Sequence, residues 1–591
     1  MVPSSFRTLL LTAGFVALHA LPLRAEETMD KMWGSSTAKP IDTSNRTALF
    51  RDGNYGMFMH WGLYSHLGGQ WRGETFYGIG EWIKRQMKIS EADYMAVAKD
   101  FNPSGFDAKA IVQTAKDAGM KWIIITSKHH EGFAMFKSKH PFNIVDATPF
   151  RRDPMKELAQ ACREAGLGFG FYYSHNQDWT APGASGGPAQ NADGSPASFE
   201  QYFTEKCLPQ VQEICTQYGP LNFVWFDTPG KMPKELVVKL ADYVQKTQPG
   251  ALLCSRIGHD LGDYESKGDM EVPPQNIEGL WETCDTTNDS WSYAWYDQNW
   301  KDSREILHRL VSTVGRGGTY LLNVGPDGKG RIPEPAAKYL RKAGEWIARY
   351  PQVIYGAGPS PWGRALPWGD VTSQGNTLSL VVFDWPADGK LWLPGLQTEI
   401  AAAGVVSNGK LLPIGWQKRG TWTVLDLPTA PTDHPASVVA IRLKGAAQVD
   451  QTLAICPNPG IASVLPVEFA EPQGVEKKGI RWMEKFGEWK FATQASQWTA
   501  EGRLAWSVTV AEPGDYHVVL TYRSDGPTAW FIETDEGAKL QNRQNGSQVY
   551  HAYPFGLLRF QTAGRHTIRL GLADLTQSQA SLESIRLTPA E

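Results

Sequence analysis

An apolar run near the middle of the chain ends on a single carboxylate. Residues 222–226 are apolar or neutral, and Asp227 follows them at once, ahead of Thr228 and Pro229. Such a run is typical of a strand buried on both faces, as in a parallel sheet covered by helices. A charged group there is costly unless it is used, and in barrel enzymes the carboxyl ends of strands carry the chemistry. Asp227 is therefore a candidate catalytic carboxylate, with capping of a turn as the alternative.

Other apolar runs in the first half of the chain also deliver polar side chains to their ends. The runs 56–59, 122–126, 167–171 and 251–254 lead to His60, to His129 and His130, to Tyr172, and to Arg256. Amphipathic stretches typical of helices separate the runs, at 107–118, 154–165, 199–218 and 234–247. This alternation predicts an α/β fold, a (β/α)8-like barrel whose polar side chains converge on one rim.

The second half of the chain has a different pattern of apolar and polar residues. Short alternating segments such as 377–383 and 421–425 are spaced by Gly and Pro, which is typical of antiparallel β-sandwiches. We expect a catalytic barrel over 26–358, a β-sandwich domain over 359–447 and a C-terminal β-sandwich over 466–591. For the aromatic residues of the last region, packing inside the sandwich is favoured over sugar binding. These are Trp482, Trp489, Trp498 and Trp530.

The N-terminus has the pattern of a secretory leader. Arg7 precedes an apolar run from Leu9 to Leu23, and Ala25 precedes two glutamates, so residues 1–25 are expected to be a signal peptide cleaved near Ala25. The run is too short for a lasting membrane span. We therefore expect a secreted or periplasmic protein with no membrane span.

Charge and cysteine usage exclude several classes of partner. The 58 Lys and Arg nearly balance the 62 Asp and Glu, so nucleic acid is not an expected partner. The six cysteines contain no CxxC spacing, so neither zinc nor a redox dithiol is indicated, and no disulfide pair is assigned. His130 and Glu131 would belong to a HExxH zinc motif only with a histidine in place of Ala134. Adjacent histidines at a strand end also point to opposite faces, so we expect no metal and no cofactor.

Tryptophan is unusually abundant, with 23 residues. Aromatic faces pack on the C–H faces of sugars, which makes carbohydrate a plausible ligand, although large barrels and sandwiches also use tryptophan as core filler. The sequence leaves the oligomeric state open.

Several motifs in the barrel region occur together and in order. They are 57–62 (MFMHWG), 81–82 (EW), 128–133 (KHHEGF), 172–174 (YYS), 225–227 (WFD), 281–284 (WETC) and 317–326 (GGTYLLNVGP). Over roughly residues 45–355 the chain resembles the α-L-fucosidases of glycoside hydrolase family 29. The C-terminal stretch is similar, much more weakly, to the carbohydrate-binding-like sandwiches appended to such enzymes. The resemblance implies a retaining exo-α-L-fucosidase that hydrolyses terminal α-L-fucosyl residues of a glycan.

The resemblance also implies roles for particular residues. Asp227 matches the nucleophile of a Trp-x-Asp motif, which would carry the covalent fucosyl-enzyme intermediate. Trp225 lies two residues earlier, on the same strand face, and Arg256 is placed to keep the nucleophile ionised. The matches to the family's hydroxyl-binding and pocket positions are His60, Glu81, Trp82, His129, His130 and Tyr172. Trp291 matches the aromatic position near the apolar 6-deoxy methyl of fucose.

The acid/base residue is left open between two carboxylates. The loop 262–273 lacks the Thr-Pro-Glu pattern common in the family, and counting back from Pro273 and Trp281 favours Asp269, with Glu271 next and Glu265 and Glu282 behind. The acid is expected to have a raised pKa, because it must be protonated at the working pH. The alternatives to an active fucosidase are a retaining glycosidase of the same fold acting on a modified fucose, and an inactive sugar-binding protein.

Overall fold

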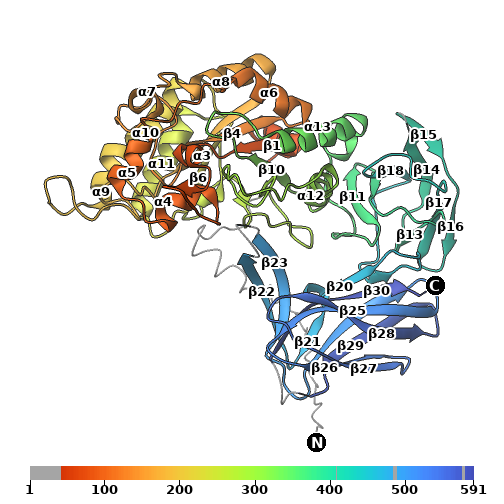
Figure 1. The fold of residues 1–591 in the computed structure, drawn as a ribbon. Helices are drawn as coiled ribbons and strands as arrows, with labels where there is room; N and C mark the ends of the chain where they lie inside the picture. Colours follow the sequence, from red (N-terminus) through yellow and green to blue (C-terminus); the bar gives the residue numbers. More distant parts are fainter. Residues whose placement is uncertain (1–41, 408, 484–486, 488, 575–578, 591) are drawn as a thin grey trace, which may run out of the picture.

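The computed structural model describes residues 42–590 except 408, 484–486, 488 and 575–578. The predicted signal peptide lies outside this range. In chain order, the described residues form a barrel, a smaller β-sandwich and a larger C-terminal β-sandwich (Figure 1). The predicted α/β fold, a barrel followed by two antiparallel sandwiches, is confirmed.

All strand pairs in the barrel sheet are parallel. The sheet has eight strands in the order β7-β6-β5-β4-β1-β10-β9-β8, and a parallel bridge between Cys254 and Tyr264 joins its two edges. The strands are β1 (Tyr55–Met59), β4 (Trp122–Lys128), β5 (Gly168–Ser174), β6 (Phe223–Asp227), β7 (Leu252–Leu253), β8 (Glu265–Ser266), β9 (Trp281–Thr286) and β10 (Thr319–Val324). Every residue of β1, β4, β5 and β6 is buried, as expected for strands covered on both faces.

Helices pack outside the strands, and several of them begin at aspartate caps. They include α6 (Ala108–Asp117), α8 (Pro154–Ala165), α11 (Lys234–Thr247), α12 (Ser303–Gly315) and α13 (Glu334–Arg349). Asp107 and Asp153 accept backbone N–H groups at the starts of α6 and α8, and Pro154 occupies the first turn, where its missing N–H costs nothing.

The stretch 199–218 is interrupted, where the sequence suggested one continuous helix. It forms α9 (Phe199–Tyr202), a π-helical segment η2 (Phe203–Cys207) and α10 (Leu208–Gln217). Pro209 stands in the first turn of α10. Proline has no N–H to donate and its ring clashes with the carbonyl four residues earlier, so the chain bulges ahead of it.

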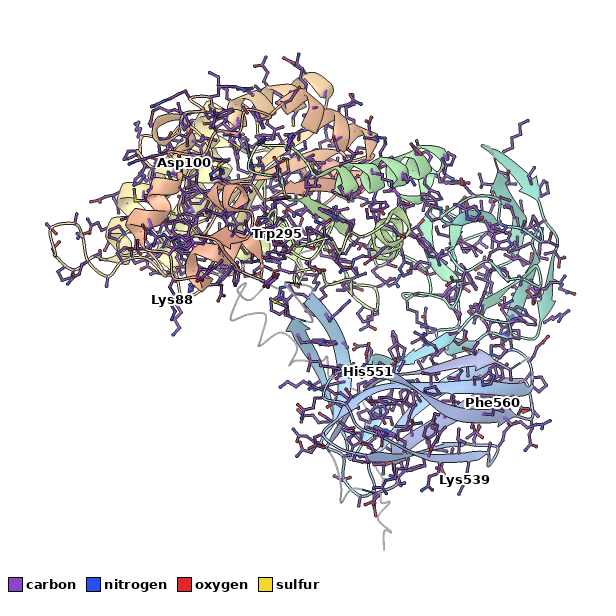
Figure 2. The ribbon with its side chains drawn as sticks, in the orientation of Figure 1. Lys88, Asp100, Trp295, Lys539, His551 and Phe560 are labelled. Carbon is purple, nitrogen blue, oxygen red and sulfur yellow. The ribbon has the colours of Figure 1, made fainter. Side chains whose placement is uncertain are left out.

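Each sandwich has its own core, and side chains fill the interior of all three regions (Figure 2). The first sandwich pairs a sheet of β11 (Gly369–Gln374), β12 (Thr377–Val382), β14 (Ile400–Ser407), β15 (Lys410–Pro413) and β18 (Ser437–Leu443) with β13 (Lys390–Pro394), β16 (Trp416–Arg419) and β17 (Trp422–Asp426). The second pairs β19 (Leu453–Ile455), β21 (Glu471–Gln473), β24 (Arg503–Val510), β26 (Thr528–Thr534), β27 (Lys539–Gln544) and β29 (Gly564–Leu572) with β20 (Ser463–Pro466), β22 (Glu476–Met483), β23 (Trp489–Ser496), β25 (Gly514–Ser524), β28 (His551–Phe560) and β30 (Ala580–Pro589).

Two strands of the second sandwich extend toward the barrel. In Figure 1, β22 and β23 leave the body of the C-terminal sandwich and end beneath the barrel. All six cysteines lie in the described part of the chain and are buried free thiols. Among the described residues, no helix is both long enough and apolar enough to cross a membrane.

Candidate active site

A cavity of about 210 Å³ lies at the carboxyl ends of the barrel strands. It brings together every site residue that the sequence singled out except three of the acid/base candidates, Glu265, Glu271 and Glu282. Those lining residues are His60, Glu81, Trp82, His129, His130, Tyr172, Trp225, Asp227, Arg256, Asp269 and Trp291. The volume falls below the roughly 300–1,000 Å³ typical of pockets for drug-sized ligands, so the cavity suits a ligand as small as one monosaccharide.

Asp227 ends β6 and receives contacts on both carboxylate oxygens. Tyr172 Oη donates to Oδ2 at 2.8 Å, and the Thr228 amide donates to Oδ1 at 2.9 Å. His130 Nε2 is 3.5 Å from Oδ2, and Arg256 Nη1 is 3.5 Å from Oδ1. Burial raises the pKa of Asp227 to about 6, with Asp269 adding to the rise and Arg256 opposing it. Arg256 alone therefore does not hold Asp227 at an ordinary carboxyl pKa.

Arg256 contacts two of the acidic residues that line the cavity, Asp227 and Asp269. The residue follows β7 in a short 3-10 turn, η3 (Ser255–Ile257), and its Nη2 lies 2.8 Å from Asp269 Oδ1 and donates to Lys267 O at 2.7 Å. Its guanidinium also lies over the Trp225 ring, 4.9 Å from the centroid. Asp227 and Asp269 are thus held by the two terminal nitrogens of one guanidinium.

Asp269 has a second cationic neighbour. Arg481 Nη2, from β22 of the C-terminal sandwich, lies 3.5 Å from Asp269 Oδ2. Burial raises the pKa of Asp269, but Arg256 and Arg481 outweigh burial and hold it below the usual value. The expectation of a raised pKa is therefore wrong for Asp269, because nothing in the sequence indicates that Arg481 lies beside this carboxylate.

The other three acid/base candidates lie outside the cavity lining. Glu271 accepts the Gly268 amide at 3.1 Å, and burial raises its pKa. Glu265 pairs with Lys267 Nζ at 2.6 Å. Glu282 accepts the indole N–H of Trp225 at 2.5 Å, and burial raises its pKa to about 7. Of the four carboxylates, only Asp269 shares the cavity with Asp227.

Asp227 and Asp269 each precede a residue with strained backbone. Thr228 has φ of 47° and Met270 has φ of 62°, in the left-handed region that non-glycine residues rarely adopt. Met270 is held there by its amide, which donates to Cys284 O at 2.8 Å, and by its carbonyl, which accepts Arg309 Nη2 at 2.8 Å. Such strain persists where the surroundings fix it, and here it helps to aim the two carboxylates.

Three histidines present neutral imidazoles to the cavity. His60 Nδ1 lies 2.9 Å from Asn323 Oδ1, and burial lowers the pKa of His60 to about 4. Burial also lowers the pKa values of His129 and His130 well below the usual value. The expectation that His129 and His130 point to opposite faces is wrong, because their ring centroids are 4.1 Å apart and both rings line the cavity. Strand alternation does not apply to them, since β4 ends at Lys128.

Aromatic rings wall the cavity. Tyr172 and Trp225, on neighbouring strands, stack with centroids 5.5 Å apart and planes at 17°. Trp291 lies 5.1 Å from His60, and Trp82 packs edge-on to His130 at 5.7 Å. Glu81 holds the segment around Trp291, since its Oε2 accepts the Ser292 amide at 3.0 Å, and burial raises its pKa to about 7.

Sequence reasoning missed several residues of the site. Those lining the cavity are Phe58, Ile79, Gln86, Thr228, Cys284, Met483 and Trp489. Phe58 and Cys284 lie inside motifs already noted, as does Asn323, whose Nδ2 donates to Trp291 O at 2.7 Å. Met483 and Trp489 come from the C-terminal sandwich. The sequence favoured packing of Trp489 inside that sandwich, but Trp489 lines the cavity.

Comparison with known proteins places the chain in a family. A family model described as Alpha-L-fucosidase matches residues 23–352. The α-L-fucosidase of Dictyostelium discoideum is 26% identical over 73% of this chain and 98% of its own, and the plasma α-L-fucosidase of Rattus norvegicus is 27% identical over 71% and 93%.

Solved structures extend the likeness to the fold. An α-L-fucosidase from Vibrio sp. strain EJY3 has a TM-score of 0.74 and 28% identity, covering 93% of this chain and 98% of its own. α-L-Fucosidase isoenzyme 1 from Paenibacillus thiaminolyticus has a TM-score of 0.61 and 30% identity, covering 68% and 99%. The motifs, the barrel and these matches agree: the chain belongs to the α-L-fucosidase family, glycoside hydrolase family 29.

Proposed function

We propose that this protein is a retaining exo-α-L-fucosidase, with Asp227 as nucleophile and Asp269 as acid and base. The observation that carries the proposal is the pair of carboxylates on one guanidinium, inside a small aromatic cavity. Retaining glycosidases need two carboxyl groups about 5 Å apart across the scissile bond. The cavity's modest volume favours one terminal sugar over an internal stretch of glycan.

The chemistry follows from the positions of the two carboxylates. Asp227 attacks the anomeric carbon, the bond to the glycosidic oxygen breaks, and Asp269 gives its proton to that oxygen. A water molecule then attacks the same carbon while Asp269 takes a proton from that water. The bond between the carbon and Asp227 breaks, and fucose is released. Tyr172, as a donor to Asp227 Oδ2, stabilises the ionised carboxylate that attacks.

The remaining lining suits a sugar with several hydroxyls and one apolar end. Three neutral imidazoles and the Glu81 carboxyl offer donors and acceptors to hydroxyl groups. Trp291, buried against Phe58 and His60, offers an apolar wall where a 6-hydroxyl would lose its hydrogen-bond partners. This wall favours 6-deoxy sugars such as fucose.

The leader-like N-terminus supports a secreted or periplasmic enzyme acting on a fucosylated glycan, and two similar proteins are described as plasma α-L-fucosidases. A tagged chain should lose residues 1–25 on export. Intact-mass analysis of the exported protein tests this, and a mass that includes the leader would contradict it.

The first experiment is hydrolysis of p-nitrophenyl α-L-fucoside by the mature protein, with the β-D-galactoside and α-D-mannoside as controls. Release from the fucoside alone, and its loss in Asp227→Ala, is the expected result. Unchanged turnover in Asp227→Ala would overturn the nucleophile assignment. No release from any of the three would favour an enzyme for a modified fucose or an inactive sugar-binding protein.

A second experiment separates Asp269 from Glu271. With an activated aryl fucoside, azide should restore turnover to Asp269→Ala by forming a fucosyl azide, because the small anion enters the space of the lost carboxyl group. Glu271→Ala is the matched control, since its carboxylate lies outside the cavity lining. Retention is tested by proton NMR of the first product, and an inverted anomer would contradict the proposal.

A further inference from the structure

One face of the β22–β23 pair carries four side chains that reach the active site. Cross-strand register pairs Arg481 with Phe491 and Met483 with Trp489, and the period of two places all four on one face. We call these four residues the hairpin face. Met483 and Trp489 line the cavity.

Arg481 lies between two rings of the sandwich and a carboxylate of the barrel. Its guanidinium lies 3.9 Å from the Trp489 centroid and 5.0 Å from that of Phe491, and its Nη2 is 3.5 Å from Asp269 Oδ2. Burial lowers the pKa of Arg481 to about 10, so it stays a cation at neutral pH. Stacking on two rings fixes the plane of the guanidinium that meets the carboxylate.

The pair also packs on the barrel at two glycines. A Cβ on Gly268 would lie 2.5 Å from the Phe491 ring, so the loop that carries Asp269 approaches the hairpin face as closely as a glycine allows. A Cβ on Gly487, whose φ is 135°, would lie 2.1 Å from Ile79, which lines the cavity. The β22–β23 pair therefore contacts the barrel at two points, the loop that carries Asp269 and Ile79 of the cavity lining.

We propose that the hairpin face forms the leaving-group side of the active site. Trp489 contacts the sugar from which fucose is released, and Arg481 is a positioning residue that sets the orientation and proton affinity of Asp269. The inference rests on the proposed fucosidase function and deepens it. The C-terminal sandwich thereby takes part in catalysis and in the choice of linkage.

The position of Asp269 identifies the side. An acid that protonates the leaving oxygen must lie beside that oxygen, so the leaving sugar lies on the Asp269 side of the fucose. Arg481 reaches Asp269 from the hairpin. Met483, the next residue of the hairpin face along β22, is 41% exposed, which places this face at the mouth of the cavity. An aromatic ring at the mouth offers a surface for the C–H face of the departing sugar.

Comparing substrates with and without a leaving sugar tests Trp489. For Trp489→Ala we expect kcat/KM on α-L-fucosyl disaccharides to fall roughly five- to tenfold. With α-L-fucosyl fluoride the fall in kcat/KM should be smaller, because fluoride offers the ring nothing to contact. Trp489→Phe should recover most of the loss. An equal loss on both substrates, or none on either, would overturn the role of Trp489.

The matched control lies on the same strands. Trp482 points to the opposite face of β22, where it stacks on Tyr550 at 5.1 Å. Trp482→Ala should leave the ratio of disaccharide to fluoride activity unchanged. A change in that ratio equal to the one in Trp489→Ala would mean that the substitutions act through the fold of the sandwich, and the proposal would fall.

The pH profile tests Arg481. The charged or titratable groups that face Asp269 are Arg256, Arg481, His60, Glu81, Cys284 and Asp227. Arg481→Gln removes one of the two cations that hold Asp269 ionised, so the acid limb of kcat/KM should move up by about one pH unit. Arg481→Lys should keep the limb near its original place. An unchanged acid limb in Arg481→Gln would overturn the positioning role.

The two levels of proposal fail in different ways. If the intact protein hydrolyses neither fucosyl fluoride nor the disaccharides, the fucosidase function fails and the inference falls with it. If the intact protein is active and the ratio and acid limb do not respond to the hairpin variants, the inference alone is overturned.

Discussion

At the scale of single residues, Asp227 and Asp269 act as one titrating pair. Burial raises the pKa of Asp227 to about 6, whereas Arg256 and Arg481 outweigh burial and lower that of Asp269. The pair carries one proton, which rests on Asp227 as the carboxyl with the higher pKa; the productive form is the minor arrangement in which Asp227 is ionised and that proton is on Asp269. Above about pH 6 the pair loses this proton, and below the lowered pKa it gains a second, so kcat/KM for a disaccharide should fall on both sides. A rate that stays flat through pH 8 would contradict this assignment.

Tyr172 should affect that titration directly. Its hydroxyl donates to Asp227 Oδ2 at 2.8 Å, a bond that lowers the pKa of Asp227. Tyr172→Phe should move the alkaline limb of kcat/KM to higher pH and lower its maximum by roughly ten- to a hundredfold. Tyr173→Phe is the control, since its hydroxyl donates to Gln210 at 2.9 Å away from the cavity. Equal effects of both substitutions would show that the hydrogen bond to Asp227 is not the cause.

At the scale of elements, strand ends were predictable and loop geometry was not. The apolar runs before His60, Tyr172 and Asp227 mark β1, β5 and β6, because a strand buried on both faces needs continuous apolar sequence. Asp269 and Glu271 stayed open because their loop depends on a positive φ at Met270 and on contacts with β9. Neither the positive φ nor the contacts with β9 produce a periodic pattern or a composition that can be recognised in the sequence.

The end of β10 should matter for substrate binding although Asn323 does not line the cavity. Its Oδ1 lies 2.9 Å from His60 Nδ1, and its Nδ2 donates to Trp291 O at 2.7 Å. Asn323→Ala removes both anchors, so we expect a higher KM and a loss of about 1–3 kcal/mol in the free energy of unfolding, because buried polar groups lose partners. Asn323→Asp keeps the contact with His60 and loses the bond to Trp291 O. Steady-state kinetics and thermal unfolding measure both effects, and wild-type KM in Asn323→Ala would contradict the anchoring role.

At the scale of the whole molecule, the order of the barrel and the sandwiches could be predicted from the sequence, but the contacts between them could not. The start of a β-rich region can be read from the sequence, because short segments of alternating apolar and polar residues between Gly and Pro turns are a local pattern. The contact between Arg481 and Asp269 joins residues far apart in sequence and depends on how two separately packed units meet. The expectation that Trp489 packs inside its sandwich failed for the same reason.

The contact between the barrel and the first sandwich should depend strongly on one buried ion pair. Arg316, at the end of α12, pairs with Asp370 of β11 at 2.7 Å, and Ser312 Oγ donates to the other oxygen of Asp370 at 2.9 Å. Both members of the ion pair are buried, so Asp370→Ala leaves a buried cation without its anion and should cost about 3–5 kcal/mol of unfolding free energy. Glu399→Ala, which breaks an exposed pair with Lys444 in the same sandwich, should leave the unfolding midpoint unchanged. Equal midpoints for the two variants would mean that the sandwich is held to the barrel by apolar packing rather than by this ion pair.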